Sequence, residues 1–160
     1  MQFIKYLSIV SFLFFVAWTP VYGQRSSEHV KELTYVKVKD YKKVITTSAI
    51  TIDRNGYIKP RRSHRMVYDQ KKRKVIVSPL KPMKFPGSQK DSVNLGGATF
   101  YCVGCKDCKV SSNQDRTEYT CDGCRDTAAN CYDEVVIEEK SVFEYQTSNG
   151  QSGYNLNDLR

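Results

Sequence analysis

Apolar and polar residues alternate with period two along much of the first half of the chain. In residues 33–41, Val and Thr share one face while Lys and Tyr share the other, which predicts a half-buried strand. Residues 44–52 are rich in Val, Ile and Thr and continue the β character. An Asp-Arg-Asn-Gly turn predicts a returning strand at 57–59, and a second hairpin is expected between 65–69 and 74–77.

Shorter strands are expected in the second half of the chain. Residues 98–101 and 118–120 each lead into a pair of cysteines, and residues 134–138 with 141–147 favour a hairpin. The prolines and glycines of residues 78–97 exclude an ordinary central strand or helix, so we interpret this stretch as a linker. The predicted fold class is mainly β: a small basic β-hairpin segment followed by a small cysteine-rich β module, either zinc-ribbon-like or disulfide-stapled.

The first 23 residues have the three parts of a secretory signal peptide. Lys5 supplies the positive charge, residues 7–18 are almost uniformly apolar, and small or tolerated residues precede a cut before Gln24. The apolar run is too short to cross a hydrocarbon layer of about 30 Å as a helix, so a retained anchor is the less favoured alternative. We therefore expect a secreted mature protein of residues 24–160 with no membrane span.

Charge is divided unevenly along the mature chain. Residues 24–97 carry 18 Lys and Arg against 6 Asp and Glu, a net of +12, whereas residues 98–160 carry 6 against 11, a net of −5. All six cysteines lie in the acidic part. This asymmetry predicts segments with different tasks. The predicted division is a signal peptide at 1–23, a basic β-rich segment at 24–77, a linker at 78–97, a cysteine-rich module at 98–147 and a disordered tail at 148–160.

One short motif, Cys-x-Gly-Cys-[Lys/Arg]-Asp, occurs twice, at 102–107 and 121–126. Two Cys-x-x-Cys turns separated by fifteen residues match the spacing of a zinc ribbon, in which four thiolates hold a tetrahedral zinc ion. Zinc is therefore one predicted cofactor, and Cys108 and Cys131 remain to pair as a disulfide. The predicted ligands are Cys102, Cys105, Cys121 and Cys124.

Disulfides are the alternative use of the same six cysteines. The secretory route is oxidising, and small secreted domains often rely on such bonds. Six cysteines allow fifteen pairings, and the spacing does not choose among them. A thioredoxin-like redox role is not favoured, because no βαβ pattern surrounds either Cys-x-x-Cys pair.

A run of basic residues spans the expected turn between 65–69 and 74–77. Followed by Val75, it resembles the monopartite nuclear localisation signal of the large-T-antigen type, and the resemblance implies an importin as partner. Two alternatives remain: a solvated basic turn, and a dibasic processing site at Arg61-Arg62 or Lys72-Arg73. The basic cluster consists of Lys71, Lys72, Arg73 and Lys74.

Motifs for catalysis are absent from the sequence. It shows no Ser-His-Asp order, P-loop or dinucleotide fingerprint, so neither an enzyme nor a small-molecule substrate is expected. His29 and His64 lie far from the cysteines in sequence and are expected at the surface. Basic residues interleaved with Tyr35, Tyr41, Tyr57 and Tyr68 are compatible with nucleic acid binding, and a soluble basic sheet is the alternative interpretation.

The whole chain resembles the small secreted cysteine-rich effectors of plant-associated fungi, of the rust and mildew type. The aromatic-x-Cys sequences at 100–102 and 119–121 match a motif of that class, although there the motif follows the signal peptide directly. The resemblance implies a virulence protein translocated into host cells and imported into the host nucleus, where it binds a regulator, chromatin or DNA. The alternative is an extracellular disulfide-rich binding protein, such as an inhibitor, an adhesive or a processed ligand.

Overall fold

The computed structural model describes residues 29–39, 41, 43–81, 89–104, 107–123 and 131–159, so the predicted signal peptide lies outside the described residues. The mainly β class is confirmed, and the described residues contain no α-helix. No helix among them is long and apolar enough to cross a membrane. The strands are β1 (Val30–Val38), β2 (Ile45–Thr47), β3 (Ile50–Ile52), β4 (Tyr57–Pro60), β5 (His64–Asp69), β6 (Lys74–Pro79), β7 (Gln89–Asn94), β8 (Ala98–Gly104), β9 (Lys109–Ser112), β10 (Glu118–Asp122), β11 (Tyr132–Glu138), β12 (Val142–Thr147) and β13 (Ser152–Tyr154), with 3-10 helices η2 (Glu139–Ser141) and η3 (Leu156–Leu159).

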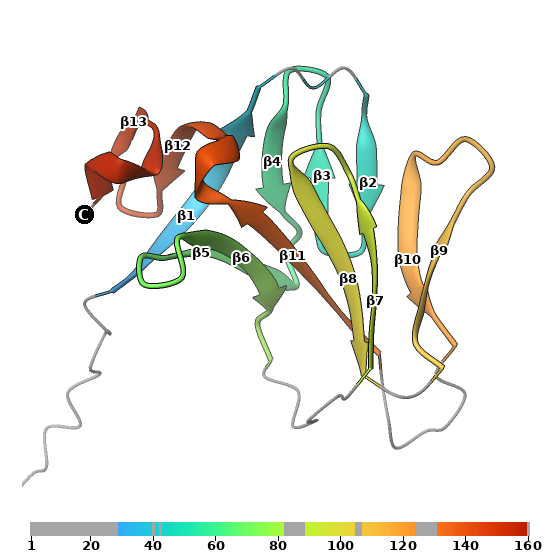
Figure 1. The fold of residues 1–160 in the computed structure, drawn as a ribbon. Helices are drawn as coiled ribbons and strands as arrows, with labels where there is room; N and C mark the ends of the chain where they lie inside the picture. Colours follow the sequence, from blue (N-terminus) through green and yellow to red (C-terminus); the bar gives the residue numbers. More distant parts are fainter. Residues whose placement is uncertain are drawn as a thin grey trace, which may run out of the picture.

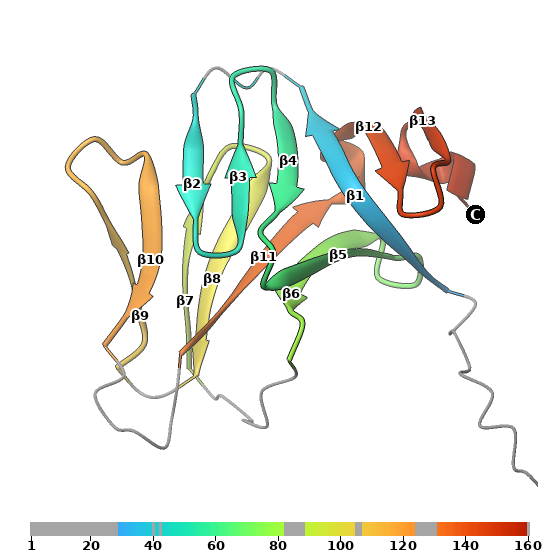
Figure 2. The same ribbon diagram turned by 180° about the vertical axis from the view of Figure 1, so that it is seen from behind.

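The strands form one folded-over sheet in the order β7-β8-β11-β6-β5-β1-β4-β3-β2-β10-β9. The long strand β1 joins the two layers, because it pairs with β5 along its first half and with β4 along its second. Its other edge carries β12, which in turn pairs with β13. Figures 1 and 2 show β7 and β8 across from β2 and β3. The two ends of the sheet approach each other, since the Val110 N–H on β9 donates to Asp91 Oδ2 on β7 (2.8 Å).

The core fills the space between the layers and follows the predicted alternation. Val36 and Val38 on β1 are buried, as are Phe100 on β8 and Tyr145 on β12. Thr34, expected on the same face as the two valines, is exposed, and Leu33 takes the inward position. The cause is an irregularity in the β1–β12 pairing between residues 33 and 35, which shifts the alternation by one residue.

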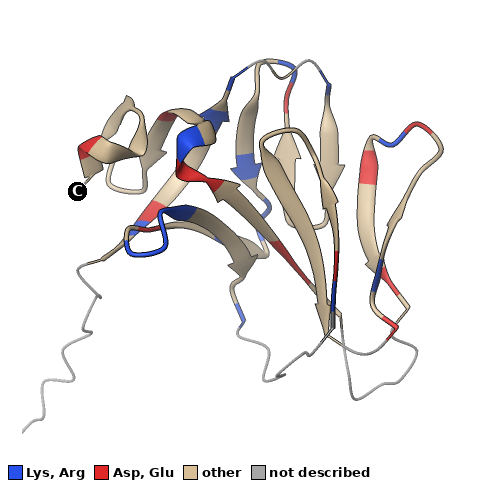
Figure 3. Ribbon diagram, in the orientation of Figure 1, with Lys and Arg blue, Asp and Glu red and all other residues tan. Residues whose placement is uncertain are grey.

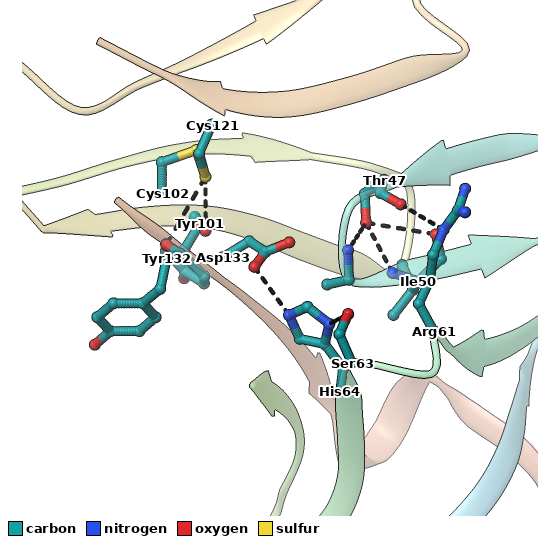
Figure 4. Close-up of polar contacts among 11 residues, drawn as sticks. Thr47, Ile50, Arg61, Ser63, His64, Tyr101, Cys102, Cys121, Tyr132 and Asp133 are labelled. Atoms are coloured by element: carbon teal, nitrogen blue, oxygen red, sulfur yellow. Dashed lines mark hydrogen bonds and ion pairs between the residues drawn. A yellow bond between two sulfur atoms is a disulfide. The ribbon is translucent and has the colours of Figure 1, made fainter. Parts of the chain in front are cut away.

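Two of the three predicted hairpins form, and one predicted strand is divided. The residues of the third, 134–138 and 141–147, do form the strands β11 and β12, but β11 pairs with β6 and β8 whereas β12 pairs with β1 and β13, so that hairpin prediction is wrong. Residues 44–52 make two strands, because Thr47 Oγ1 accepts hydrogen bonds from the N–H groups of Ala49 and Ile50 and so closes an extra turn (Figure 4). At the next turn Gly56 has φ +81°, and a Cβ there would lie 2.3 Å from the Val38 carbonyl oxygen. Only glycine fits that close approach.

The predicted segments contribute strands to the same sheet. Strand β11 from the acidic part lies between β6 and β8, and β12 pairs with β1 from the basic part. The described part of the predicted linker contains β7. The prediction of a disordered tail at 148–160 is wrong: β13 and η3 are formed there, and Leu156 and Leu159 are buried in the core.

Candidate functional site

Two disulfides fasten the cysteine-rich part of the sheet. Cys102 on β8 is bonded to Cys121 on β10, with 5.4 Å between the Cα atoms, and Cys108 is bonded to Cys131. The second bond joins the two cysteines that the repeated motif leaves over. Because β8 and β10 belong to opposite ends of the strand order, the first bond connects the two layers (Figure 4).

The Cys102–Cys121 bond is incompatible with the predicted four-thiolate zinc site. Both sulfurs were expected to ligate the metal, but a sulfur that is bonded to another sulfur is not a thiolate. The remaining two predicted ligands, Cys105 and Cys124, lie outside the described residues. Within the part of the chain that the structure describes, no group of three or more His, Cys, Asp or Glu side chains could hold a metal ion.

The basic cluster spans the tight turn between β5 and β6, visible as a blue loop in Figure 3, and its last residue, Lys74, begins β6. Carboxylates contact three of its four side chains. Lys72 Nζ lies 3.5 Å from Asp69 Oδ2, and Lys74 Nζ lies 3.2 Å from Glu138 Oε1. Arg73 Nε donates to Glu139 Oε2 over 3.1 Å, although Arg73 itself has a left-handed φ of 54°. The cluster is therefore bent and partly neutralised, rather than extended.

The Arg73 contact anchors the turn to the core. Glu139 is 7 % exposed and also accepts a hydrogen bond from the buried Tyr68 hydroxyl (3.0 Å). The hydrogen bond from Arg73 to Glu139 raises the pKa of the guanidinium above its ordinary value. Nuclear localisation signals of the large-T-antigen type bind as extended peptides. The hairpin would therefore have to open before an importin could bind the Arg73 side chain.

A buried histidine was not foreseen from the sequence. His64 was expected at the surface, but its side chain is 6 % exposed and its Nε2 lies 2.9 Å from Asp133 Oδ1 (Figure 4). The Ser63 hydroxyl lies 2.9 Å from the other ring nitrogen, Nδ1. The other Asp133 oxygen, Oδ2, is buried and accepts no hydrogen bond from the residues that the structure describes. His29, in contrast, is exposed as predicted.

The Ser63, His64 and Asp133 side chains form a chain of contacts in the order seen in a hydrolase triad. Ser63 directly precedes His64 in the sequence, so their contact is local. None of the cavities described below is lined by these three residues. We interpret the trio as a polar link between β5 and β11, which His64 makes by reaching across Pro79 of β6.

The clearest surface feature is a group of aromatic and lysine side chains over β1, β4, β12 and β13, which we call the aromatic–basic face. The rings of Tyr35 and Tyr57 pack edge to face with centroids 5.3 Å apart, and those of Phe143 and Tyr154 lie 5.8 Å apart. The lysines of β1 and β4 colour adjacent strands blue in Figure 3. The aromatic–basic face comprises Tyr35, Lys37, Lys39, Tyr57, Lys59, Lys140, Phe143 and Tyr154.

Cations and one carboxylate fix the rings of the aromatic–basic face. Lys37 Nζ lies 4.8 Å from the centre of the Tyr57 ring, and Lys39 Nζ lies 4.9 Å from that of Phe143. Glu144 accepts from the Tyr35 hydroxyl (3.0 Å). Desolvation, followed by the hydrogen bond to Glu144, raises the pKa of Tyr35. Tyr35, Tyr57 and Phe143 thus each have a charged side chain in contact.

A hollow of about 350 Å³ opens beside the two exposed rings. Lys39 and Lys140 flank it, and Phe143 and Tyr154, which are 37 % and 68 % exposed, line it. Of the four tyrosines singled out in the sequence, Tyr35 and Tyr57 belong to the aromatic–basic face. Tyr68 is fully buried, and the Tyr41 hydroxyl donates to the Leu95 carbonyl in another part of the molecule.

Ion pairs join the basic part of the chain to the acidic part. Four Lys or Arg side chains from the first part contact glutamates of the second: Lys37–Glu144, Arg73–Glu139, Lys74–Glu138 and Lys90–Glu134. The opposite net charges of the two parts therefore partly neutralise each other through partly exposed ion pairs between strands.

Comparisons with protein-family models, with curated proteins and with solved structures found no match to this chain.

Proposed function

We propose that this chain is a secreted, disulfide-stapled binding protein without catalytic activity, and that its aromatic–basic face holds a single-stranded nucleic acid. The observation that carries the proposal is the hollow in which two exposed rings meet two lysines. Secretion rests on the signal-like residues 1–23, and the disulfides suit an oxidising compartment.

Rings and lysines act on different parts of such a partner. Unpaired bases stack on aromatic side chains, which contributes about 1–3 kcal/mol per base. The lysine side chains attract the phosphates, and the net charge of +8 on the chain raises the encounter rate. A duplex hides its base faces in the stack, so the aromatic–basic face should prefer single strands.

The test is a titration of a labelled single strand and a matched duplex with oxidised residues 24–160 at two salt concentrations. The single strand should bind more tightly, with an affinity that falls as salt rises. Tyr154→Ala should weaken single-strand binding by about 5- to 150-fold, which is the loss of one stacked base. Lys31→Ala is the matched control, because Lys31 is exposed on β1 but outside the aromatic–basic face. Polyglutamate, a polyanion without bases, serves as a further probe. The proposal would be contradicted if it bound as tightly as the single strand, or if Tyr154→Ala did not change the affinity for the single strand.

The exposed turn between β5 and β6 supports a second candidate, a translocated effector that enters a host nucleus through an importin. Lys71 and Lys72 stand at the tip of the hairpin, accessible to a partner. In a fluorescent fusion too large for passive diffusion, alanine at residues 71–74 should abolish nuclear accumulation. Alanine at the exposed Lys31 and Arg54 is the matched control and should leave it intact. Unchanged accumulation after substitution of residues 71–74 would eliminate this candidate.

A further inference from the structure

A cavity of about 380 Å³ lies where three connections meet at one end of the sandwich. The segment between β1 and β2 supplies Tyr41 and Lys43, and the β7–β8 turn supplies Asn94, Leu95 and Gly96. The β9–β10 turn adds Arg116. This cavity shares no residue with the aromatic–basic face or with its hollow.

The inner wall of the cavity is apolar and aromatic. Ile45, Leu95 and Tyr119 are each at least nine-tenths buried. The Tyr41 ring is fixed by the hydrogen bond from its hydroxyl to the Leu95 carbonyl, which bridges two of the three connections. Burial raises the pKa of Tyr41 to about 12, so this hydroxyl stays neutral and keeps donating at physiological pH.

The rim of the cavity is cationic. Lys43 and Arg116 are both exposed, and none of the described residues that line the cavity is a carboxylate. Within the described part of the chain, neither cation forms an ion pair. Asn94 adds a polar group, whose Oδ1 accepts from the Gly96 N–H (2.7 Å) and so holds the β7–β8 turn in shape. Two cations that form no ion pair with a described residue therefore stand over an aromatic wall.

We propose that this cavity binds a small ring compound that carries a phosphate. A cavity of this volume lies in the size range of small-molecule sites, which combine apolar walls with a few placed polar groups. A phosphomonoester carries between one and two negative charges at pH 7, which matches two cations better than a single carboxylate would. The ring would pack against Tyr41 and Tyr119, with the phosphate between Lys43 and Arg116.

The experiment follows backbone amide shifts of oxidised residues 24–160 by nuclear magnetic resonance. Phenyl phosphate, inorganic phosphate and benzyl alcohol serve as the three probes. Phenyl phosphate should give saturating shifts at Lys43, Asn94 and Gly96, with at least about tenfold higher affinity than either other probe. Since Lys43 and Arg116 are exposed, the variant Lys43→Glu/Arg116→Glu should remain folded, and it should lose at least about tenfold in affinity. Lys31→Glu, which makes an equivalent change elsewhere, should bind as the unmodified chain does.

Three results would overturn the proposal. The first is the absence of saturating shifts at the cavity with phenyl phosphate. The second is equal affinity for phenyl phosphate and inorganic phosphate, because it would show that the aromatic wall contributes nothing. The third is equal binding by the Lys43→Glu/Arg116→Glu variant with a well-dispersed spectrum, because the rim cations would then play no part.

Discussion

Removal of the Cys102–Cys121 bond should lower the stability of the oxidised protein by about 3 kcal/mol. The bond closes a loop with a sequence separation of 19 residues, and the chain-entropy relation gives about 3 kcal/mol for a loop of this length. Cys102 is fully buried, so Cys102→Ala/Cys121→Ala also loses some packing. Because domains of this size have roughly 5–15 kcal/mol of net stability, the effect should be large.

The assay is equilibrium unfolding in urea, followed by tyrosine fluorescence and circular dichroism. With a slope of about 1–3 kcal/mol per molar urea, the midpoint should fall by about 1–3 M. Fully reduced samples of the variant and the unmodified chain provide the control. Their midpoints should nearly coincide, because the bond is absent from both.

Two outcomes would refute the reasoning about this bond. One is a loss below about 1 kcal/mol in the oxidised variant, since the loop-closure estimate would then fail. The other is strong destabilisation of the unmodified protein by a metal chelator, with recovery on addition of zinc. That result would restore the four-thiolate interpretation, in which metal binding supplies folding free energy.

Three further predictions concern the core and its polar groups. Leu156→Ala should cost about 2–5 kcal/mol in urea unfolding, because the tail leucine is fully buried; a change near zero would mean that the tail does not dock. Asp133→Ala should lower the free energy of unfolding by about 1–3 kcal/mol more than Asp133→Asn does, since only Ala leaves His64 Nε2 without its partner. Equal losses of stability in the two variants would mean that this hydrogen bond does not stabilise the fold. Burial raises the pKa of Tyr41, so the contribution of its neutral hydroxyl to folding stability is present below a pH of about 10 and is lost as the pH rises to about 12. Unfolding measured across that range should show a smaller alkaline loss for Tyr41→Phe.

Local patterns in the sequence predicted the strands and turns well, because alternation and turn chemistry act over a few residues. The expected strands 65–69 and 74–77 correspond to β5 and β6, and the Asp-Arg-Asn-Gly turn connects β3 to β4. The repeated motif correctly placed a strand before each cysteine pair. The glycine of the second copy is required by a close approach of the backbone, since a Cβ on Gly123 would lie 1.9 Å from the Asp107 carbonyl oxygen.

The order of the strands could not be predicted, because pairing between distant segments leaves no local mark. Nothing near 132–138 indicates that β11 lies between β6 and β8, and the glutamates that follow could not be matched to lysines sixty residues earlier. The aromatic–basic face was found only in part. The interleaving of basic residues with tyrosines pointed to Tyr35 and Tyr57, but nothing indicated the contribution of Phe143 and Tyr154 from the far end of the chain.

The interleaved sheet also sets an order of events during synthesis. In a chain synthesised from its N-terminus, the edge of β6 that pairs with β11 stays unpaired until β11 has been made. The edge of β1 that pairs with β12 stays unpaired for longer still. At about 5–20 residues per second, that delay lasts several seconds. The basic first part would meanwhile stay soluble through its own charge repulsion, and the acidic strands arrive last to neutralise it. Folding should thus be a single late event that follows nearly complete synthesis of the strands, with no stable half-molecule before it.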